Sequence, residues 1–254
     1  MESYVCENVF VPLRSGPSHK SEMLSQVLFG EKYTIKDQVG KWLKIESDFD
    51  GYQGWIDKDH LQHSIDKTHT RGLVITKALA CLKEDNSKMV LEPGSEIYNP
   101  DFDANTFTAG EKLYRVTSAF NKSYISINEG LTDTAIRFIN SPYIWGGRIP
   151  SGLDCSGLTQ LIYKIHGITI PRDSQQQSEN GTAVSFIHEV RPGDLVFFDN
   201  ERGQIAHVGM IISEGLVIHA SGRVRIDAID HQGIFKSETK KYSHRLRLIK
   251  RIIN

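Results

Sequence analysis

The sequence predicts two small β-barrels followed by an α+β domain in which helices pack on an antiparallel sheet. The chain has 254 residues, more than the ~100 to 150 residues of a usual single domain. Its first half consists of short apolar runs separated by turn residues, and its last third shows a helical pattern followed by strands. We place the three parts at residues 1–66, 67–130 and 131–254.

The first part contains strand-like runs from Val5 to about Leu61. Glycine, proline, aspartate and serine interrupt these runs at intervals that are typical of a small β-barrel. The segments "RSGPS", "LFGE", "WLKI" and "GYQGWI" resemble those of a bacterial SH3-like domain. From Leu73 to about Ile127 a less regular version follows, with "EPGSE" and "TAGEKL" as turns. We interpret it as a second, divergent SH3-like barrel.

The last part begins with a helical pattern and continues with strands. "TDTAIRFIN" has apolar residues at helical spacing, Thr132 stands where an N-cap belongs, and Ser141-Pro142 ends the helix. After Val190 the chain is rich in strand patterns, namely "DLVFF", "HVGMII", "LVIHAS", "VRIDAI" and "HRLRLIKRII". A helix-first, strand-later order predicts an antiparallel sheet.

Charge and cysteine content exclude several classes of protein. A formal net charge of -1 offers no electrostatic basis for binding nucleic acid or an anionic membrane. The chain lacks the ~18 consecutive apolar residues of a membrane span, and its start lacks the pattern of a secretory signal. Its three cysteines include no CxxC pair, which argues against a disulfide scaffold or a cysteine-rich zinc site. We expect a cytoplasmic protein; a periplasmic or secreted chain whose signal had been removed would look the same.

One cysteine, Cys155, precedes a clear helical pattern. Apolar residues follow it at positions 158, 161, 162 and 165, Asp154 is placed as the N-cap, and Gly167 can end the helix. At a helix start, unpaired N–H groups favour a thiolate, so we expect a lowered thiol pKa and a nucleophile. Gly152 and Gly157 are expected to permit a tight turn and the close approach of a substrate backbone. The alternative is a small buried hydrophobe, which free cysteines usually are.

Two histidines differ from those in polar, loop-like segments. His207 opens one strand pattern and His219 lies near the end of the next, with residues 213–215 as the turn. A three-residue loop pairs residue 212 with 216 and Gly209 with His219, so both histidines point to one face. This favours Cys155 as nucleophile, His207 as base and His219 as the group that orients it. The alternatives are structural histidines, or a zinc site formed by the same three residues.

The motifs of the last part then resemble those of a known family. "YIWGG", "LDCSGLTQLIY", "IPRDSQQQ", "RPGDLVFF", "HVGMII" and "VIHASG" are similar to those of NlpC-type papain-like cysteine peptidases, over residues 132–254. With two SH3-like domains in front, the whole chain resembles the γ-D-glutamyl-L-diamino acid endopeptidases of murein-peptide recycling. The resemblance implies a papain-like α+β fold.

The resemblance also implies roles for single residues. Cys155, His207 and His219 match the family's nucleophile, base and third polar residue. Residues that match its substrate-binding positions are Tyr143, Trp145, Asp154, Ser156 and Ser174, and the first SH3-like domain is expected to recognise the substrate's free amine through Glu22 and Tyr52. Simpler roles stay open: the aromatic residues as core or rim, Asp154 as a helix cap only, and Ser174 as the cap of the segment that follows it.

The implied reaction is hydrolysis of the bond between γ-D-Glu and an L-diamino acid in short murein peptides with a free N-terminal L-Ala. The first domain is expected to close one end of the cleft and so to exclude long glycan-linked stems. We expect a monomer that needs no cofactor or metal and has no nucleic-acid or membrane partner. The alternatives are a hydrolase of intact peptidoglycan with wall-binding modules, and a binding module without activity.

Overall fold

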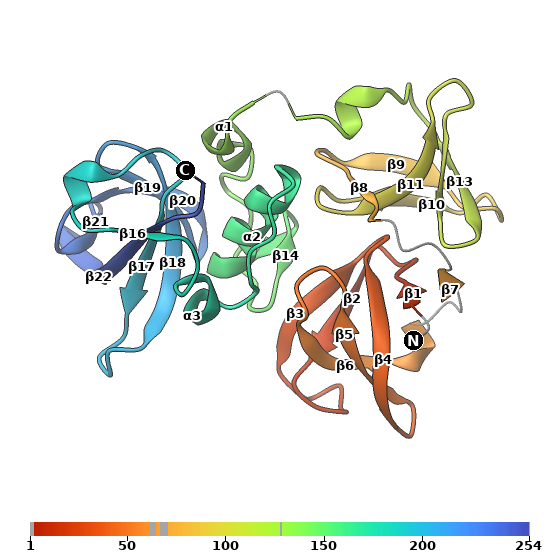
Figure 1. The fold of residues 1–254 in the computed structure, drawn as a ribbon, viewed down its shortest axis with the longest axis horizontal. Helices are drawn as coiled ribbons and strands as arrows, with labels where there is room; N and C mark the ends of the chain where they lie inside the picture. The colour runs from red at the N-terminus through yellow and green to blue at the C-terminus, as the bar shows by residue number, and fades with distance from the viewer. Residues whose placement is uncertain (1–2, 61–64, 67–70, 128, 254) are drawn as a thin grey trace. The chain divides into compact units, whose positions relative to one another are not determined.

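The computed structural model describes residues 3–60, 65–66, 71–127 and 129–253. Contacts within the chain divide it into two compact units, residues 1–128 and 129–254 (Figure 1). The expected boundary between residues 66 and 67 adjoins positions outside the described residues, so the division into three parts stays a prediction. In the described part of the chain, no helix is long and apolar enough to cross a membrane.

The first unit contains two antiparallel sheets. Seven strands form the first, in the order β3-β2-β6-β5-β4-β1-β7. Their bounds are β1 Ser3–Val5, β2 Phe10–Arg14, β3 Met23–Leu28, β4 Lys32–Val39, β5 Trp42–Ser47, β6 Gln53–Asp57 and β7 Ile65–Asp66, with a short 3-10 helix at Lys58–His60. Alternating side chains of these strands, including Val11, Leu13, Leu43 and Ile45, form a buried core.

Six strands form the second sheet, in the order β10-β9-β13-β12-β11-β8. Their bounds are β8 Leu73–Val74, β9 Leu79–Leu82, β10 Lys88–Leu91, β11 Glu96–Asp101, β12 Thr106–Ala109 and β13 Lys112–Val116, followed by a 3-10 helix at Lys122–Tyr124. Phe29, in the turn between β3 and β4, packs edge-on against Phe107 and Tyr114 of the second sheet. The core of the second sheet therefore also includes Val5 of β1 and Phe29, whereas the first sheet keeps a core of its own.

The second unit is built around a seven-stranded sheet in the order β16-β22-β17-β18-β19-β20-β21. Because β22 also pairs with β21, six of these strands close into a ring. The bounds are β16 Thr182–Val184, β17 Leu195–Asp199, β18 Ile205–Ser213, β19 Leu216–Ser221, β20 Arg223–Ile229, β21 Gly233–Lys236 and β22 Lys241–Arg251, with a 3-10 helix at Ile187–Glu189. The pairings are antiparallel, as the sequence predicted.

Three helices and a short hairpin complete this unit. They are α1 Leu131–Ile136, the hairpin of β14 Arg148–Ile149 and β15 Gly152–Leu153, α2 Cys155–Ile165, and α3 Ser174–Gln177. α2 contacts β14, β18 and β19, and α3 contacts β18 (Figure 1). The start of α2 is thereby brought to the face of the ring that carries the histidines of β18 and β19.

One predicted helix cap, Thr132, was wrong, and so was the alternative that Ser174 caps the segment after it. The N-cap of α1 is Gly130, and Thr132 lies inside the helix. The carboxylate of Asp133 accepts the N–H of Gly130 at 3.3 Å, which satisfies that backbone group and starts the helix earlier than predicted. The N-cap of α3 is Asp173, and Ser174 is the first helical residue.

Candidate active site

The start of α2 is built as the sequence predicted. Asp154 is the N-cap, and its Oδ1 accepts the N–H of Gly157 at 2.7 Å. Cys155 is the first helical residue and is 7% exposed. Gly167 adopts a φ of 75°, a left-handed conformation that ends helices and favours glycine. The sulfur therefore lies where N–H groups without helical partners gather.

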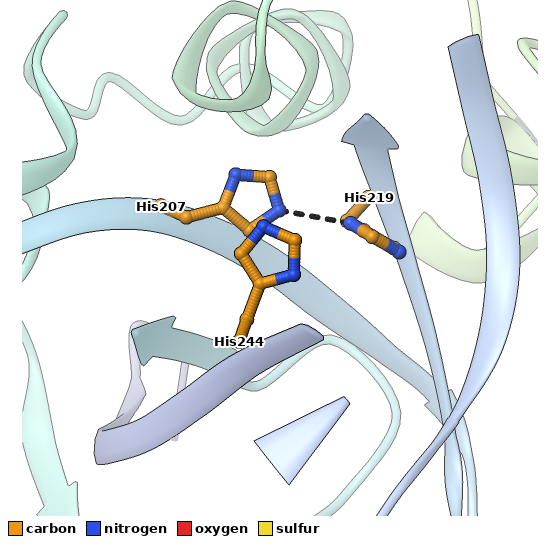
Figure 2. Close-up of side chains that lie close together, drawn as sticks. All are labelled: His207, His219 and His244. Atoms are coloured by element: carbon orange, nitrogen blue, oxygen red, sulfur yellow. Dashed lines mark hydrogen bonds between the residues drawn. The ribbon is translucent and has the colours of Figure 1, made fainter. Parts of the chain in front are cut away.

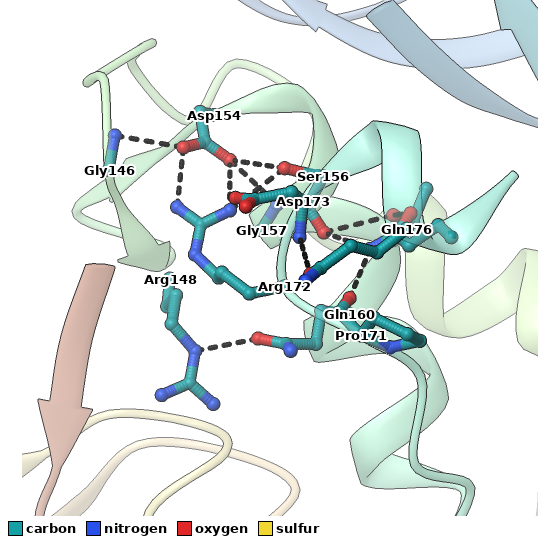
Figure 3. A network of polar contacts seen from close by, with 12 residues as sticks. Gly146, Arg148, Asp154, Ser156, Gly157, Gln160, Pro171, Arg172, Asp173 and Gln176 are labelled. Carbon is teal, nitrogen blue, oxygen red and sulfur yellow. Dashed lines mark hydrogen bonds and ion pairs between the residues drawn. The ribbon is translucent and has the colours of Figure 1, made fainter. Parts of the chain in front are cut away.

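A buried ion pair supports this helix start from one side (Figure 3). Arg172, 2% exposed, donates to both carboxylate oxygens of Asp154 at 2.5 and 3.1 Å and to Oγ of Ser156 at 2.8 Å. The N–H of Gly146 also donates to Asp154, at 2.8 Å. Both oxygens of Asp154 are therefore bonded within the protein, which favours its role as a cap over contact with a substrate. Sequence reasoning missed Arg172, because a lone arginine after a proline carries no pattern of its own.

The glycines near Cys155 have a different role from the expected one. A Cβ on Gly157 would lie 2.0 Å from the carbonyl oxygen of Gly147, and a Cβ on Gly152 would lie 2.5 Å from the side chain of Ile144. No side chain fits at Gly157, because its neighbour there is backbone, whereas at Gly152 the side chain of Ile144 would have to move. The expected approach of a substrate backbone was wrong for Gly157, because the loop before the helix occupies that space.

The histidine pair is confirmed, although part of its predicted register is not. Gly209 pairs with His219 as predicted. Residue 212 does not pair with Leu216; a bulge lies there and Ser213 pairs with Leu216 instead, which shortens the turn to two residues. Because the bulge is beyond Gly209, the parity of His207 and His219 is unchanged. Nε2 of His207 and Nδ1 of His219 are 2.8 Å apart (Figure 2).

A carboxylate extends this pair and fixes its protons. Oδ2 of Asp227, on β20, lies 2.9 Å from Nε2 of His219, and Oδ1 accepts from Arg225 at 2.7 Å. Because an ionised carboxylate only accepts, Nε2 of His219 carries its proton and Nδ1 accepts from Nε2–H of His207. Nδ1 of His207 is then the basic nitrogen. Asp227 was not predicted from the sequence, since its place near His219 depends on the β19–β20 register.

Burial keeps both imidazoles neutral. It lowers the pKa of His207 well below the usual 6.5, and the neighbouring His219 and His244 lower it further. Burial also lowers the pKa of His219, although the hydrogen bond and charge of Asp227 oppose this shift. Burial would raise the pKa of Asp227, but hydrogen bonds from His219 and Arg225 outweigh it and keep this carboxyl ionised.

The expected low pKa of Cys155 is contradicted. Burial, with the charge of Asp154, raises the pKa of this thiol to about 12. The N–H of Val208, the charge of Arg172 and the N–H of Ser156 oppose the shift without cancelling it. The helix start is thus outweighed by the removal of water, and the thiol is neutral at physiological pH. The Val208 contact also brings the sulfur to the backbone beside His207.

Four further predicted residues lie in the same unit. Burial raises the pKa of Tyr143 to about 12, and the charges of the nearby Cys155 and Asp154 contribute to this shift. Trp145 is 57% exposed, which fits a rim rather than a core position. Ser156 is buried within the Arg172 network, and Ser174 is half-buried at the start of α3.

The two residues expected to recognise the amine belong to the first unit. Glu22 is exposed, just before β3, and its carbonyl oxygen accepts from the N–H of Ser15 at 2.9 Å. Tyr52 is half-buried and packs against the core of the first sheet. Their part in binding stays a prediction.

Family models match both units. A model described as the NlpC/P60 family matches residues 140–243, and one described as the bacterial dipeptidyl-peptidase SH3 domain matches residues 13–61. A curated Bacillus cereus protein, gamma-D-glutamyl-L-lysine dipeptidyl-peptidase, is 34% identical over 229 residues, 80% of this chain and 68% of that protein. A Bacillus subtilis protein of the same name is 32% identical, over 77% of this chain and 71% of that one.

A solved structure agrees with this assignment at the level of the fold. The crystal structure of an NlpC/P60 family protein from Bacillus cereus is 23% identical and covers the whole of both chains with a TM-score of 0.80. The predicted fold is therefore confirmed as an NlpC/P60 domain behind an N-terminal SH3 domain, and the SH3-like nature of the second sheet stays a prediction. On these relationships, the chain belongs to the NlpC/P60 family of cysteine peptidases.

Proposed function

We propose that the protein hydrolyses the bond between γ-D-Glu and an L-diamino acid in murein peptides with a free N-terminal L-Ala, releasing L-Ala-γ-D-Glu. Two relatives matched over more than two thirds of their own length are named gamma-D-glutamyl-L-lysine dipeptidyl-peptidases, which supports this bond type. The diamino acid is L-lysine or meso-diaminopimelate.

The observation that carries this proposal is the continuous chain from Asp227 through His219 to His207 beside the sulfur of Cys155. Nδ1 of His207 takes the thiol proton as the sulfur attacks the scissile carbonyl. Because both groups start neutral, proton transfer accompanies the attack rather than preceding it. His219 and Asp227 stabilise the imidazolium as it forms.

The later steps use groups at the start of α2. N–H groups at the helix start and the hydroxyl of Tyr143 donate to the oxyanion, where a raised pKa keeps that hydroxyl protonated. The His207 imidazolium then protonates the leaving amine of the diamino acid. A water attacks the thioester, gives its proton to His207, and releases the peptide acid and the thiol.

Residues around the sulfur are proposed to select the substrate. Ser174 donates to the α-carboxylate of D-Glu, Ser156 lies next to the nucleophile, and Trp145 forms an apolar wall. Glu22 and Tyr52 recognise the free amine. Asp154 we assign to positioning, because Arg172 and two backbone N–H groups already use its oxygens.

Mass spectrometry of the products from L-Ala-γ-D-Glu-meso-diaminopimelate and from its L-lysine counterpart tests the bond and the third residue. The expected product is L-Ala-γ-D-Glu, and acetylating the L-Ala amine is expected to abolish cleavage. Glu22→Gln and Tyr52→Phe should raise KM for the free peptide and leave the acetylated peptide uncleaved. Equal turnover of the acetylated and free peptides would contradict the proposed amine requirement.

We also propose that the protein acts as a cytoplasmic monomer on free peptides. Comparing turnover of the free tripeptide with release of peptides from intact sacculi separates this role from wall hydrolysis. Faster release of peptides from sacculi than turnover of the free tripeptide would favour wall hydrolysis.

A further inference from the structure

A third histidine that the proposed reaction does not use lies against the catalytic pair. His244, on β22, is half-buried and stacks on His207, with ring centroids 4.2 Å apart and planes inclined by 23° (Figure 2). Its ring centroid is 5.7 Å from that of His219. One nitrogen from each of the three rings lies within 4.8 Å of the others. Among the described residues, this group brings three potential metal ligands together, and Cys155 is not part of it.

The outer nitrogens of two rings are already occupied by oxygen partners. Nε2 of His219 bonds Asp227 at 2.9 Å, and Nδ1 of His244 lies 2.9 Å from Oγ of Ser243. Oγ of Ser243 already donates to the carbonyl oxygen of Ile234, so Nδ1–H of His244 donates to Oγ and Nε2 of His244 carries a lone pair. Nδ1 of His219 carries the other lone pair, which accepts from His207. Histidines that ligate metals commonly donate the other ring N–H to an oxygen in this way, which fixes the tautomer and the orientation of the ring.

The three rings supply nitrogen donors of the kind that neutral imidazole offers to a metal ion. Asp227 favours a bound cation, whereas Lys236 and Arg225 oppose it. Neutral nitrogen donors select zinc, copper, nickel or cobalt over magnesium and calcium, which prefer oxygen.

Solvent can reach the group through His244. This residue lines an open groove of about 930 Å³, together with residues that include Asp199, His231, Tyr242 and Arg245. Zn–N bonds of about 2.0 to 2.1 Å require ligand nitrogens about 3.3 Å apart. His207 and His219 are nearly at that spacing, so the ring of His244, at the groove, is the one that must turn out of the stack.

We infer that His207, His219 and His244 bind a zinc-like transition-metal ion that reversibly inhibits the peptidase. The metal replaces the proton between Nε2 of His207 and Nδ1 of His219, and that proton moves to Nδ1 of His207. The base nitrogen is then protonated and cannot take the thiol proton. The inhibition rests on the proposed role of His207, whereas the metal binding does not.

Binding is measured first, without activity, on the full-length Cys155→Ala protein, which lacks the thiol as a competing ligand. Titration with Co²⁺ is expected to give one ion per chain with the visible absorption of a tetrahedral nitrogen site, and Zn²⁺ should displace it. His244→Gln should weaken Zn²⁺ binding, measured by competition with a chromophoric chelator, at least tenfold. The matched control is His231→Gln, which removes an exposed histidine from the same groove and should not change the affinity. Absence of a stoichiometric site, or equal affinity in the His244→Gln and His231→Gln proteins, would overturn the inference.

Inhibition is measured next, on proteins that keep Cys155. Zn²⁺ should stop peptide hydrolysis, EDTA should restore it, and the zinc concentration for half-inhibition should rise at least tenfold in His244→Gln, relative to that variant's own metal-free rate. Unchanged zinc sensitivity of His244→Gln would assign the inhibition to the thiol and overturn the inference. If no peptide is cleaved even with EDTA while Cys155→Ala still binds the metal, the proposed function fails and the metal site stands.

Discussion

Two buried polar groups flank Cys155, and they differ in charge. The Asp154 group consists of Asp154, Ser156 and Arg172 and contains a full ion pair. The histidine group consists of His207, His219 and His244, three rings whose pKa values are lowered by burial. The first group bonds every carboxylate oxygen to fixed donors, whereas the second leaves a nitrogen lone pair on His207.

The difference in charge indicates different roles: the Asp154 group fixes the structure around Cys155, and the histidine group takes part in proton transfer. Charges that are paired and buried keep one geometry, because breaking the pair leaves a charge without solvent. Neutral rings joined by hydrogen bonds can pass a proton without such a cost. We therefore expect substitutions in the Asp154 group to act on stability and substitutions of His207, His219 or the carboxylate of Asp227 behind them to act on rate.

The largest expected effect is at the nucleophile that both groups serve. Cys155→Ala should lower kcat for the murein tripeptide by a factor of about a thousand or more, because no other thiol can form the acyl-enzyme. Cys81→Ala, at a buried cysteine of the first unit, should retain the wild-type rate per folded molecule. Wild-type turnover by Cys155→Ala would end the proposed mechanism.

Removing the cation of the Asp154 group tests whether this group stabilises the fold. Arg172→Met should lower the free energy of unfolding by about 3 to 5 kcal/mol, because it leaves the buried carboxylate of Asp154 unpaired. The matched change Arg137→Met, at an ion pair 3.2 Å long between partly exposed partners, should cost less than about 1 kcal/mol. Urea denaturation followed by tryptophan fluorescence and circular dichroism measures both. Similar losses for the two variants would remove the contrast between the groups.

Removing the carboxylate of Asp227, which bonds His219, tests whether the histidine pair takes part in proton transfer. Asp227→Asn should lower kcat about tenfold to a hundredfold with little change in KM, because the tautomer of His219 is no longer fixed and the His207 imidazolium is less stabilised. Loss of this negative charge also lowers the pKa of the base further, so the acid limb of the pH profile should move to lower pH. A lower kcat with an unmoved acid limb would indicate a structural role only.

The smallest expected effect is on the pH profile, which reports directly on the protonation of His207 and Cys155. His207 has a folded-state pKa below 6.5, so the neutral base persists as pH falls through 6.5, and kcat/KM should decline only below that value, with a chelator present. Because the thiol pKa is raised to about 12, Cys155 should show no thiolate plateau and iodoacetamide labelling should still accelerate up to about pH 9. A decline of kcat/KM between about pH 7 and 9, with pH-independent labelling, would reveal a preformed thiolate-imidazolium pair instead.

Local patterns predicted much of this site correctly. The N-cap at Asp154, the helix after Cys155 and the shared face of His207 and His219 follow from spacing along one helix and one hairpin, and the structure confirms them. Patterns at helix ends were less reliable, since Thr132 and Ser174 both lie inside helices whose caps are one or two residues earlier.

The order of the elements, the family motifs and the residues proposed as nucleophile and base therefore follow from the sequence. The partners and the protonation of those residues depend on the tertiary structure. Arg172 reaches Asp154 from 18 positions away, while Asp227 and His244 reach the pair through the closed sheet. The same closure removes water from Cys155 and raises its pKa, and burial of this kind depends on all neighbouring elements together, which no local pattern encodes.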